Sequence, residues 1–104
     1  MKLQINHWNN ETDGLLYEMA MKKKLRDKGY LVSCYVYPPG TIFSEHTHSV
    51  HKIDGVLSGR FKMTMYGQSI VLQAGDSLVV PKNVAHSAEV IGDEAVVSLD
   101  AIKY

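Results

Sequence analysis

Two histidines lie two residues apart, at His46 and His48, and a third, His86, follows a proline-containing turn at 81–83. In a β-strand, residues i and i+2 project from the same face, so both imidazoles of a His-x-His pair can point at one ion. Imidazole nitrogen is a ligand for Zn, Fe, Ni and Cu. The pair is therefore a candidate chelating site, although a surface strand can also have two histidines that bind no metal.

The length, composition and charge of the chain indicate one globular domain without a nucleic-acid partner. The chain has 104 residues, 45% of them hydrophobic and 21% charged, and eleven Lys and Arg residues balance eleven Asp and Glu residues. A nucleic-acid-binding module is expected to have a clustered basic surplus. The only basic run, 22–24 with Arg26, is better explained as the solvated face of a helix.

The sequence also limits the expected location of the protein. Cys34 is the only cysteine, so no intrachain disulfide can form, and its alternating apolar surroundings predict a small buried side chain. No apolar run approaches 18 residues, and polar residues interrupt the N-terminus before a secretory signal could form. We therefore expect a cytoplasmic protein with no membrane association.

The hydrophobic period predicts one helix followed by many strands. Residues 11–28 have apolar positions at three- and four-residue steps, and Gly29 fits a left-handed C-cap. From residue 30 the apolar residues recur at every second position, which is typical of β-strands. Expected strands are 30–37, 42–48, 53–57, 61–66, 69–73, 77–80, 85–90 and 95–102. This spacing predicts an all-β sandwich or small barrel with one N-terminal α-helix.

The histidines fall within a longer pattern of glycine, histidine and proline. Its positions, in order, are Gly40, His46, His48, Lys52 and Gly59, and then Gly75, Pro81, Asn83 and His86. This order and spacing resembles the two signature motifs of the cupin superfamily, as found in small single-domain cupins of the conserved-barrel type. The resemblance implies one domain over 1–104, with a helix at about 11–28 and an antiparallel jelly-roll β-barrel at about 30–103. It also implies a barrel that is often dimeric and holds one divalent metal (Zn, Fe, Ni, Mn or Cu) or an unmetallated ligand pocket, with His46, His48 and His86 as the metal ligands.

The pattern departs from the family at three positions. Asn83 replaces a glycine, which is mild because Asn tolerates a left-handed backbone, and Val90 replaces a polar residue. Lys52 replaces the glutamate ligand, and its ammonium at roughly 5 Å from a cation would cost about 3 kcal/mol at an effective dielectric of about 20. The lysine can point outward, lose its proton, or pair with Asp54 on the same strand face, which we expect. His51 is either a fourth ligand turned inward by a bulge or an exposed turn residue.

The remaining pocket residues are expected among inward-facing aromatics and thioethers, most of which are simply core. The candidate ligand-binding residues are Lys52, Asp54, Tyr35, Tyr37, Phe43 and Met63, with Met65 a further candidate. Lys52 would act as a positively charged anchor for an acidic small molecule. Glu45 lies on the strand face opposite the chelating pair and is a poor ligand candidate.

Two function classes fit these residues. The first is a metalloenzyme acting on a small acidic organic molecule, with dioxygenase, isomerase and decarboxylase activities all compatible with the resemblance. The second is a non-catalytic module that binds a small ligand or senses a metal. A third possibility is that the motifs have a structural role only, in forming the turns. The apolar surface of an N-terminal helix with Trp8 predicts a homodimer.

Overall fold

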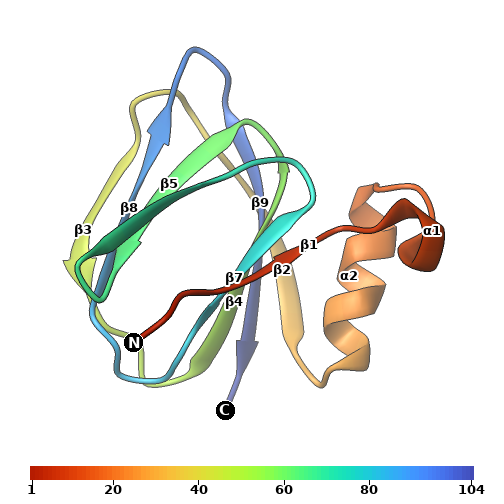
Figure 1. The fold of residues 1–104 in the computed structure, drawn as a ribbon, viewed down its shortest axis with the longest axis horizontal. Coiled ribbons are helices and arrows are strands. Elements are labelled where there is room, and N and C mark those ends of the chain that lie inside the picture. Colours follow the sequence, from red (N-terminus) through yellow and green to blue (C-terminus); the bar gives the residue numbers. More distant parts are fainter.

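The computed structural model describes residues 1–104 and has nine strands and two helices. The strands are β1 (Gln4–His7), β2 (Leu31–Tyr37), β3 (Ile42–His46), β4 (His51–Ser58), β5 (Arg60–Met65), β6 (Gln68–Leu72), β7 (Asp76–Val80), β8 (His86–Ile91) and β9 (Val96–Lys103). The helices are α1 (Asn10–Asp13) and α2 (Glu18–Asp27). Figure 1 shows both helices lying outside the strands, beside β2 and β1.

All strand pairs are antiparallel, and they form two sheets. One sheet has the order β1-β7-β4-β9-β2 and the other β3-β8-β5-β6. This confirms the predicted antiparallel β-architecture, but the barrel is not closed. The turn at 38–41 moves the chain from one sheet to the other, so β2 and β3 are successive strands that lie at the edges of different sheets. No hydrogen-bonded ladder joins them, and the molecule is a two-sheet sandwich with an open side.

The single predicted helix over 11–28 is wrong, because the segment contains two helices. Gly14 ends α1 with φ +77° and ψ −164°, a conformation that breaks the helical path. The Asn9 side chain accepts a hydrogen bond from the Glu11 backbone N–H and caps α1. Strand β1, which the sequence analysis did not predict, pairs with β7 at the edge of the larger sheet. Only Ile5 of its four residues is apolar, so β1 has no alternating pattern to recognise.

The hydrophobic core fills the space between the two sheets. Phe61, Met63 and Met65 point inward from β5, while Lys62 and Thr64 face outward, as the alternation predicts. The other buried members of this core are Val56, Leu72, Leu78, Val80, Ala88, Val90 and Val96. Val90, at a position where the family resemblance implies a polar residue, is thus part of the core.

A second hydrophobic cluster lies on the outer face of the larger sheet. Met21 and Leu25 of α2 pack there against β4 and β9. A Cβ at Gly55 would lie 2.8 Å from Met21 Sδ, so the glycine permits the close approach of the helix. Cys34 is only partly buried beside this cluster, less than predicted. Neither helix is long and apolar enough to cross a membrane.

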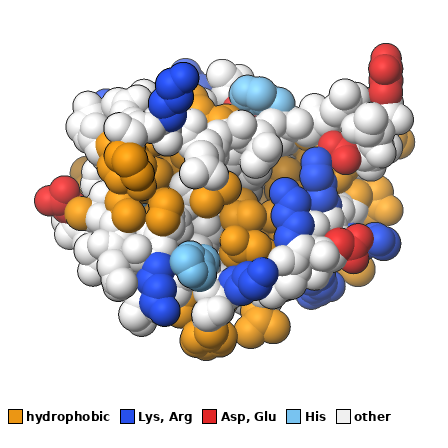
Figure 2. Space-filling view, turned by 60° about the horizontal axis from the view of Figure 1, so that its bottom comes forward, with side chains coloured by type: hydrophobic (Ala, Val, Ile, Leu, Met, Phe, Trp, Pro, Cys, Tyr) orange, Lys and Arg blue, Asp and Glu red, His pale blue; other side chains and the backbone are white.

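The surface includes apolar side chains, some of them on a free sheet edge. Figure 2 shows hydrophobic groups reaching the surface of one face between basic and histidine side chains. On the edge strand β2, Leu31 is 62% exposed and Val36 is 64% exposed. Exposed apolar side chains on an unpaired edge strand favour association with another chain.

The turn glycines provide a stability test of the fold. Gly59 has φ +83°, and a Cβ there would overlap the carbonyl oxygen of Ala95 and lie 2.9 Å from Val96 Cα. Gly40 has φ +81° but open space around it. We predict that Gly59→Ala lowers the free energy of unfolding by about 3 kcal/mol, and Gly40→Ala by about 1 kcal/mol. Urea denaturation measures both, and equal losses would contradict the described packing.

Candidate metal centre

Two of the three histidines lie in the neighbouring strands β3 and β8, and the third lies in the turn after β3. His46 is the last residue of β3 and His86 the first residue of β8, and the two are directly paired in the ladder. His48 lies two residues beyond the end of β3, so the predicted strand 42–48 ends earlier than expected. Strand parity therefore does not explain the position of His48. The cross-strand pairing and the turn after β3 bring the three imidazoles together.

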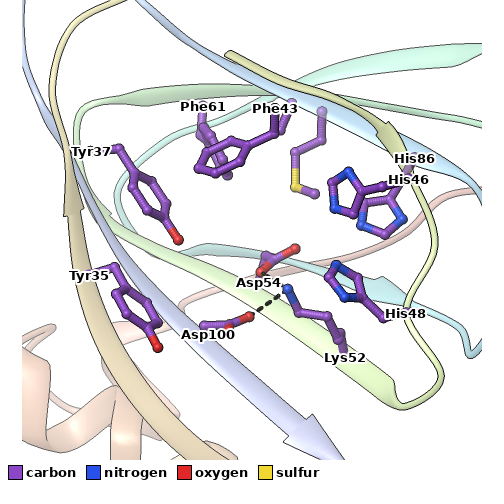
Figure 3. A pocket seen from close by; sticks show the side chains of 12 residues that line it. Tyr35, Tyr37, Phe43, His46, His48, Lys52, Asp54, Phe61, His86 and Asp100 are labelled. Carbon is purple, nitrogen blue, oxygen red and sulfur yellow. Dashed lines mark ion pairs between the residues drawn. The ribbon is translucent and has the colours of Figure 1, made fainter. Parts of the chain in front are cut away.

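The three rings converge on one point at the edge of a cavity (Figure 3). The ring centroids of His46 and His86 are 4.4 Å apart, and those of His48 lie 4.7 Å from His46 and 5.1 Å from His86. One ligand nitrogen from each residue lies within 4.8 Å of the others. This is a cluster of donors of the kind that can share one cation.

Hydrogen bonds orient two of these rings. His46 Nδ1 lies 2.6 Å from the Ser44 carbonyl oxygen, and His86 Nδ1 lies 2.9 Å from the Val84 carbonyl oxygen. A carbonyl oxygen only accepts, so each Nδ1 donates its proton and each Nε2 retains a free lone pair. Backbone partners of this kind fix the tautomer of a metal-binding histidine.

The third ring has a nitrogen without a partner. His48 Nε2 is buried and makes no hydrogen bond. A buried polar atom without a partner costs about 1–3 kcal/mol, and a bound ligand or ion removes that cost. The unpartnered atom and the two oriented lone pairs therefore fit a divalent metal ion.

Electrostatics keeps the rings in the form that binds metals. Burial lowers the pKa of His48, and the nearby charge of Lys52 lowers it further. Burial also lowers the pKa of His86, against the opposing effect of its hydrogen bond to Val84. Both imidazoles are therefore neutral at neutral pH, which metal coordination requires.

The histidines line one end of a cavity of about 280 Å³ between the open edges of the two sheets. Its lining residues are Tyr35, Tyr37, Phe43, His46, His48, Lys52, Asp54, Phe61, Met63, His86, Ala88 and Asp100. All six predicted pocket residues are present. His51 is exposed at the start of β4 and outside the lining, Met65 is buried in the core, and Glu45 is exposed.

Lys52 points into the cavity and lies between two carboxylates. Its Nζ is 2.6 Å from Asp100 Oδ1 and 3.5 Å from Asp54 Oδ1. Burial alone would lower the pKa of Lys52, but the two aspartates raise it above the ordinary value, so the ammonium is charged. The expected pairing with Asp54 is present, and the shorter contact is with a residue that the sequence analysis missed.

Asp100 was missed because its position depends on a long-range strand pair. Asp54 in β4 faces Asp100 directly in the β4–β9 ladder. The only signal in the sequence was a charged residue inside the apolar strand predicted at 95–102. Burial raises the pKa of Asp54 to about 6, although Lys52 opposes the shift.

Aromatic side chains form the wall opposite the histidines. The Tyr37 ring packs edge-on against Phe43, with centroids 4.9 Å apart, and also contacts Phe61 at 5.7 Å. Burial, followed by the charges of Asp100 and Asp54, raises the pKa of Tyr37 to about 12. Its hydroxyl is therefore neutral and available as a hydrogen-bond donor. The cavity combines three chelating nitrogens, a charged group and an apolar wall.

Comparisons with known proteins agree with this geometry. A family model described as Cupin domain matches residues 34–102. Nitrosourea synthase from Streptomyces achromogenes subsp. streptozoticus is 32% identical over 73 residues, which are 68% of this chain but 15% of that enzyme. A structure of an oxalate decarboxylase variant from Bacillus subtilis has 31% identity and a TM-score of 0.62, covering 69% of this chain and 21% of that one. An RmlC-like cupin from Shewanella frigidimarina has 26% identity and a TM-score of 0.63, covering 70% and 64%.

The Lys52 ion pairs give a testable stability prediction. Lys52→Met leaves the buried carboxylate of Asp54 and the partly buried carboxylate of Asp100 without their cation, and we expect a loss of about 3 kcal/mol at pH 8. The loss should be smaller at pH 5 than at pH 8, because removal of Lys52 raises the pKa of Asp54 further above about 6, and the variant's Asp54 takes up a proton as the pH falls. The folded pKa of Asp54 lies above its ordinary value of 3.8, so its protonation adds stability as the pH falls through this range.

Chemical denaturation at pH 5 and pH 8 measures this effect. The matched control is Lys62→Met, because Lys62 is exposed and lies 4.0 Å from the exposed Glu89. That control should change stability by less than about 0.5 kcal/mol at either pH. An equal loss at both pH values for Lys52→Met would contradict the paired arrangement.

Proposed function

The chain belongs to the cupin family, and we propose that it binds one divalent metal ion through His46, His48 and His86 to act on, or bind, a small acidic organic molecule. The observation that supports this most directly is the buried, unpartnered Nε2 of His48 beside two imidazoles whose Nδ1 protons are already donated. Zn, Fe, Ni, Mn and Cu all accept imidazole nitrogen, and affinity order alone does not choose among them.

The donor set favours an anionic ligand. Three neutral imidazoles leave the double positive charge of an ion uncompensated, because Lys52 replaces the carboxylate ligand. When bound, such an ion polarises a carbonyl or carboxylate oxygen, or activates a water or oxygen molecule. The chain itself orients two rings through the carbonyls of Ser44 and Val84 and excludes water from one side through Tyr37 and Phe43.

The relatives support a small acidic substrate. Oxalate decarboxylase is named for action on a small dicarboxylic acid, and its structure is similar to 69% of this chain. The cavity of about 280 Å³ is just below the usual range for ligand pockets, roughly 300–1,000 Å³, and favours a compact molecule. The chain spans 21% of that enzyme, so the likeness concerns this domain alone.

A non-catalytic role as a ligand-binding or metal-sensing module is the second candidate. The observation in its favour is that Lys52 stands where a carboxylate ligand was expected, so the cavity offers an ion three imidazole ligands without that fourth one. Turnover separates the two functions. Metal-loaded protein that binds a small acid without oxygen uptake, decarboxylation or isomerisation would favour the binding module.

The metal assignment is tested by alanine substitution of the histidines. We predict one divalent metal per chain in the wild type, and loss of tight binding in His46→Ala, His48→Ala and His86→Ala, because each removes one of three ligands. The matched controls are His7→Ala and His51→Ala, since both side chains are exposed and outside the cavity. Elemental analysis and calorimetric titration measure binding. Stoichiometric metal in the His46/His48 double variant would rule out the site.

We also propose that the chain forms a homodimer through the free edge of β2. The sequence analysis based the dimer on the apolar surface of the N-terminal helix and Trp8, but Trp8 packs partly buried against the cluster around α2. Its Nε1–H donates a hydrogen bond to the Gly14 carbonyl oxygen at 2.8 Å. The exposed apolar residues Leu31 and Val36 lie instead on β2, an edge strand with unpaired backbone groups.

The dimer is tested at this edge strand. We predict a dimer by light scattering at high micromolar concentration, and a monomer for Val36→Lys, because a charged side chain on an edge strand opposes pairing. The control is Ser69→Lys on the edge strand β6 of the other sheet. A wild-type monomer, or an unchanged dimer in Val36→Lys, would contradict the proposal.

A further inference from the structure

The cavity has a second polar group, formed by Lys52, Asp54 and Asp100, whose charges do not balance. One ammonium faces two carboxylates, so the group has one negative charge in excess when both aspartates are ionised. Asp54 is 6% exposed, and only 11% of the Lys52 side chain is exposed. An uncompensated charge at such a position is costly unless it gains a proton or a cation.

The two carboxylates cannot separate to relieve this excess. Asp54 and Asp100 are direct cross-strand neighbours in the β4–β9 ladder, and the backbone hydrogen bonds of both strands keep them together. Lys52 Nζ lies 2.6 Å from Asp100 Oδ1 and 3.5 Å from Asp54 Oδ1. A single ammonium is therefore shared between the two carboxylates.

Aromatic rings flank this carboxylate pair. Tyr35 and Tyr37 of β2 lie beside Asp100 and Asp54 on the same side of the cavity, as Figure 3 shows. Tyr35 is about half exposed and forms part of the cavity mouth. Carboxylates together with aromatic faces are the surroundings that stabilise a positively charged nitrogen group.

We propose that the ligand of this cavity carries a cationic nitrogen group, an ammonium, amidinium or guanidinium, that binds Asp100 and Asp54 against Tyr35 and Tyr37. Its other end is the anionic group that the proposed function assigns to the metal, so this part of the inference rests on that function. The ligand class is then a small zwitterion, an acid with an amino or guanidino group. Lys52 is a positioning residue that holds the two carboxylates.

This assignment changes the role of Lys52 expected from the sequence. A lysine that anchors an acid needs a free positive charge, but the Lys52 ammonium already has two carboxylate partners. A second acidic group placed there would meet a net negative charge. The structure thus favours a ligand with opposite charges at its ends over a dicarboxylate.

The test uses Zn-loaded protein and three series of probes. The ω-amino acids from glycine to 6-aminohexanoate are compared with monocarboxylates and dicarboxylates of matched length, by calorimetric titration. We expect at least one ω-amino acid to bind about tenfold more tightly than both of its matched acids. A dicarboxylate that binds more tightly than every ω-amino acid, or an absence of ω-amino acid binding at millimolar concentration, would overturn the proposal.

Isosteric variants identify the carboxylate. Asp100→Asn should reduce the ratio of the affinity for the ω-amino acid to that for its matched acids by at least about fivefold. Asp93→Asn, in the exposed turn after β8, should leave this ratio unchanged. Metal content is measured for each variant, so a change in metal loading is separated from a change in ligand preference. A preference retained in Asp100→Asn would overturn the assignment.

Metal-free protein separates this inference from the proposed function. Butylammonium and butanol are titrated into the apoprotein, and amide chemical shifts report binding. We expect butylammonium alone to shift residues around Asp100 and Asp54, whether or not the protein binds metal. If the protein binds no metal but still binds butylammonium, the metal site is refuted and the subsite for a cationic group is supported. Equal shifts from butanol and butylammonium would refute the subsite.

Discussion

The register of two antiparallel strand pairs brings together the two pairs of polar side chains on which the cavity depends. In the β3–β8 ladder His46 faces His86, and in the β4–β9 ladder Asp54 faces Asp100. A shift of one residue in either ladder would turn these side chains to the opposite face of the sheet. His46 and His86 belong to the smaller sheet, and the charged group belongs to the larger one. The open side of the sandwich leaves the space between them accessible.

Much of the architecture could be predicted, because local signals encode it. Alternation gave the inward positions of Phe61, Met63 and Met65, and the left-handed turn predicted at Asn83 is present with φ +65°. Two local signals were too weak: the helix pattern continued through Gly14, and β1 had no alternation. The spacing identified the three histidines, but strand parity explains only part of their convergence.

The features that were missed depend on partners far apart in the chain. Asp100 enters the cavity because β9 pairs with β4, and nothing near residue 100 indicates that neighbour. The state of Lys52 depends on the same pair, so the sequence left three alternatives where the structure shows one. The proposed dimer contact could not be located from the sequence, since that proposal depends on which apolar residues remain on a free edge after the sheets have formed.

The hydrogen bonds that orient His46 and His86 have the same local form, since each ring donates to the carbonyl two residues earlier in its own strand or turn. The acceptors are backbone atoms, so the orienting bond does not itself depend on which side chains occupy positions 44 and 84. Evolution can therefore conserve the geometry of this site while its neighbouring residues drift. Searches that weight side-chain identity around the histidines would overlook distant relatives whose imidazoles are oriented in the same way.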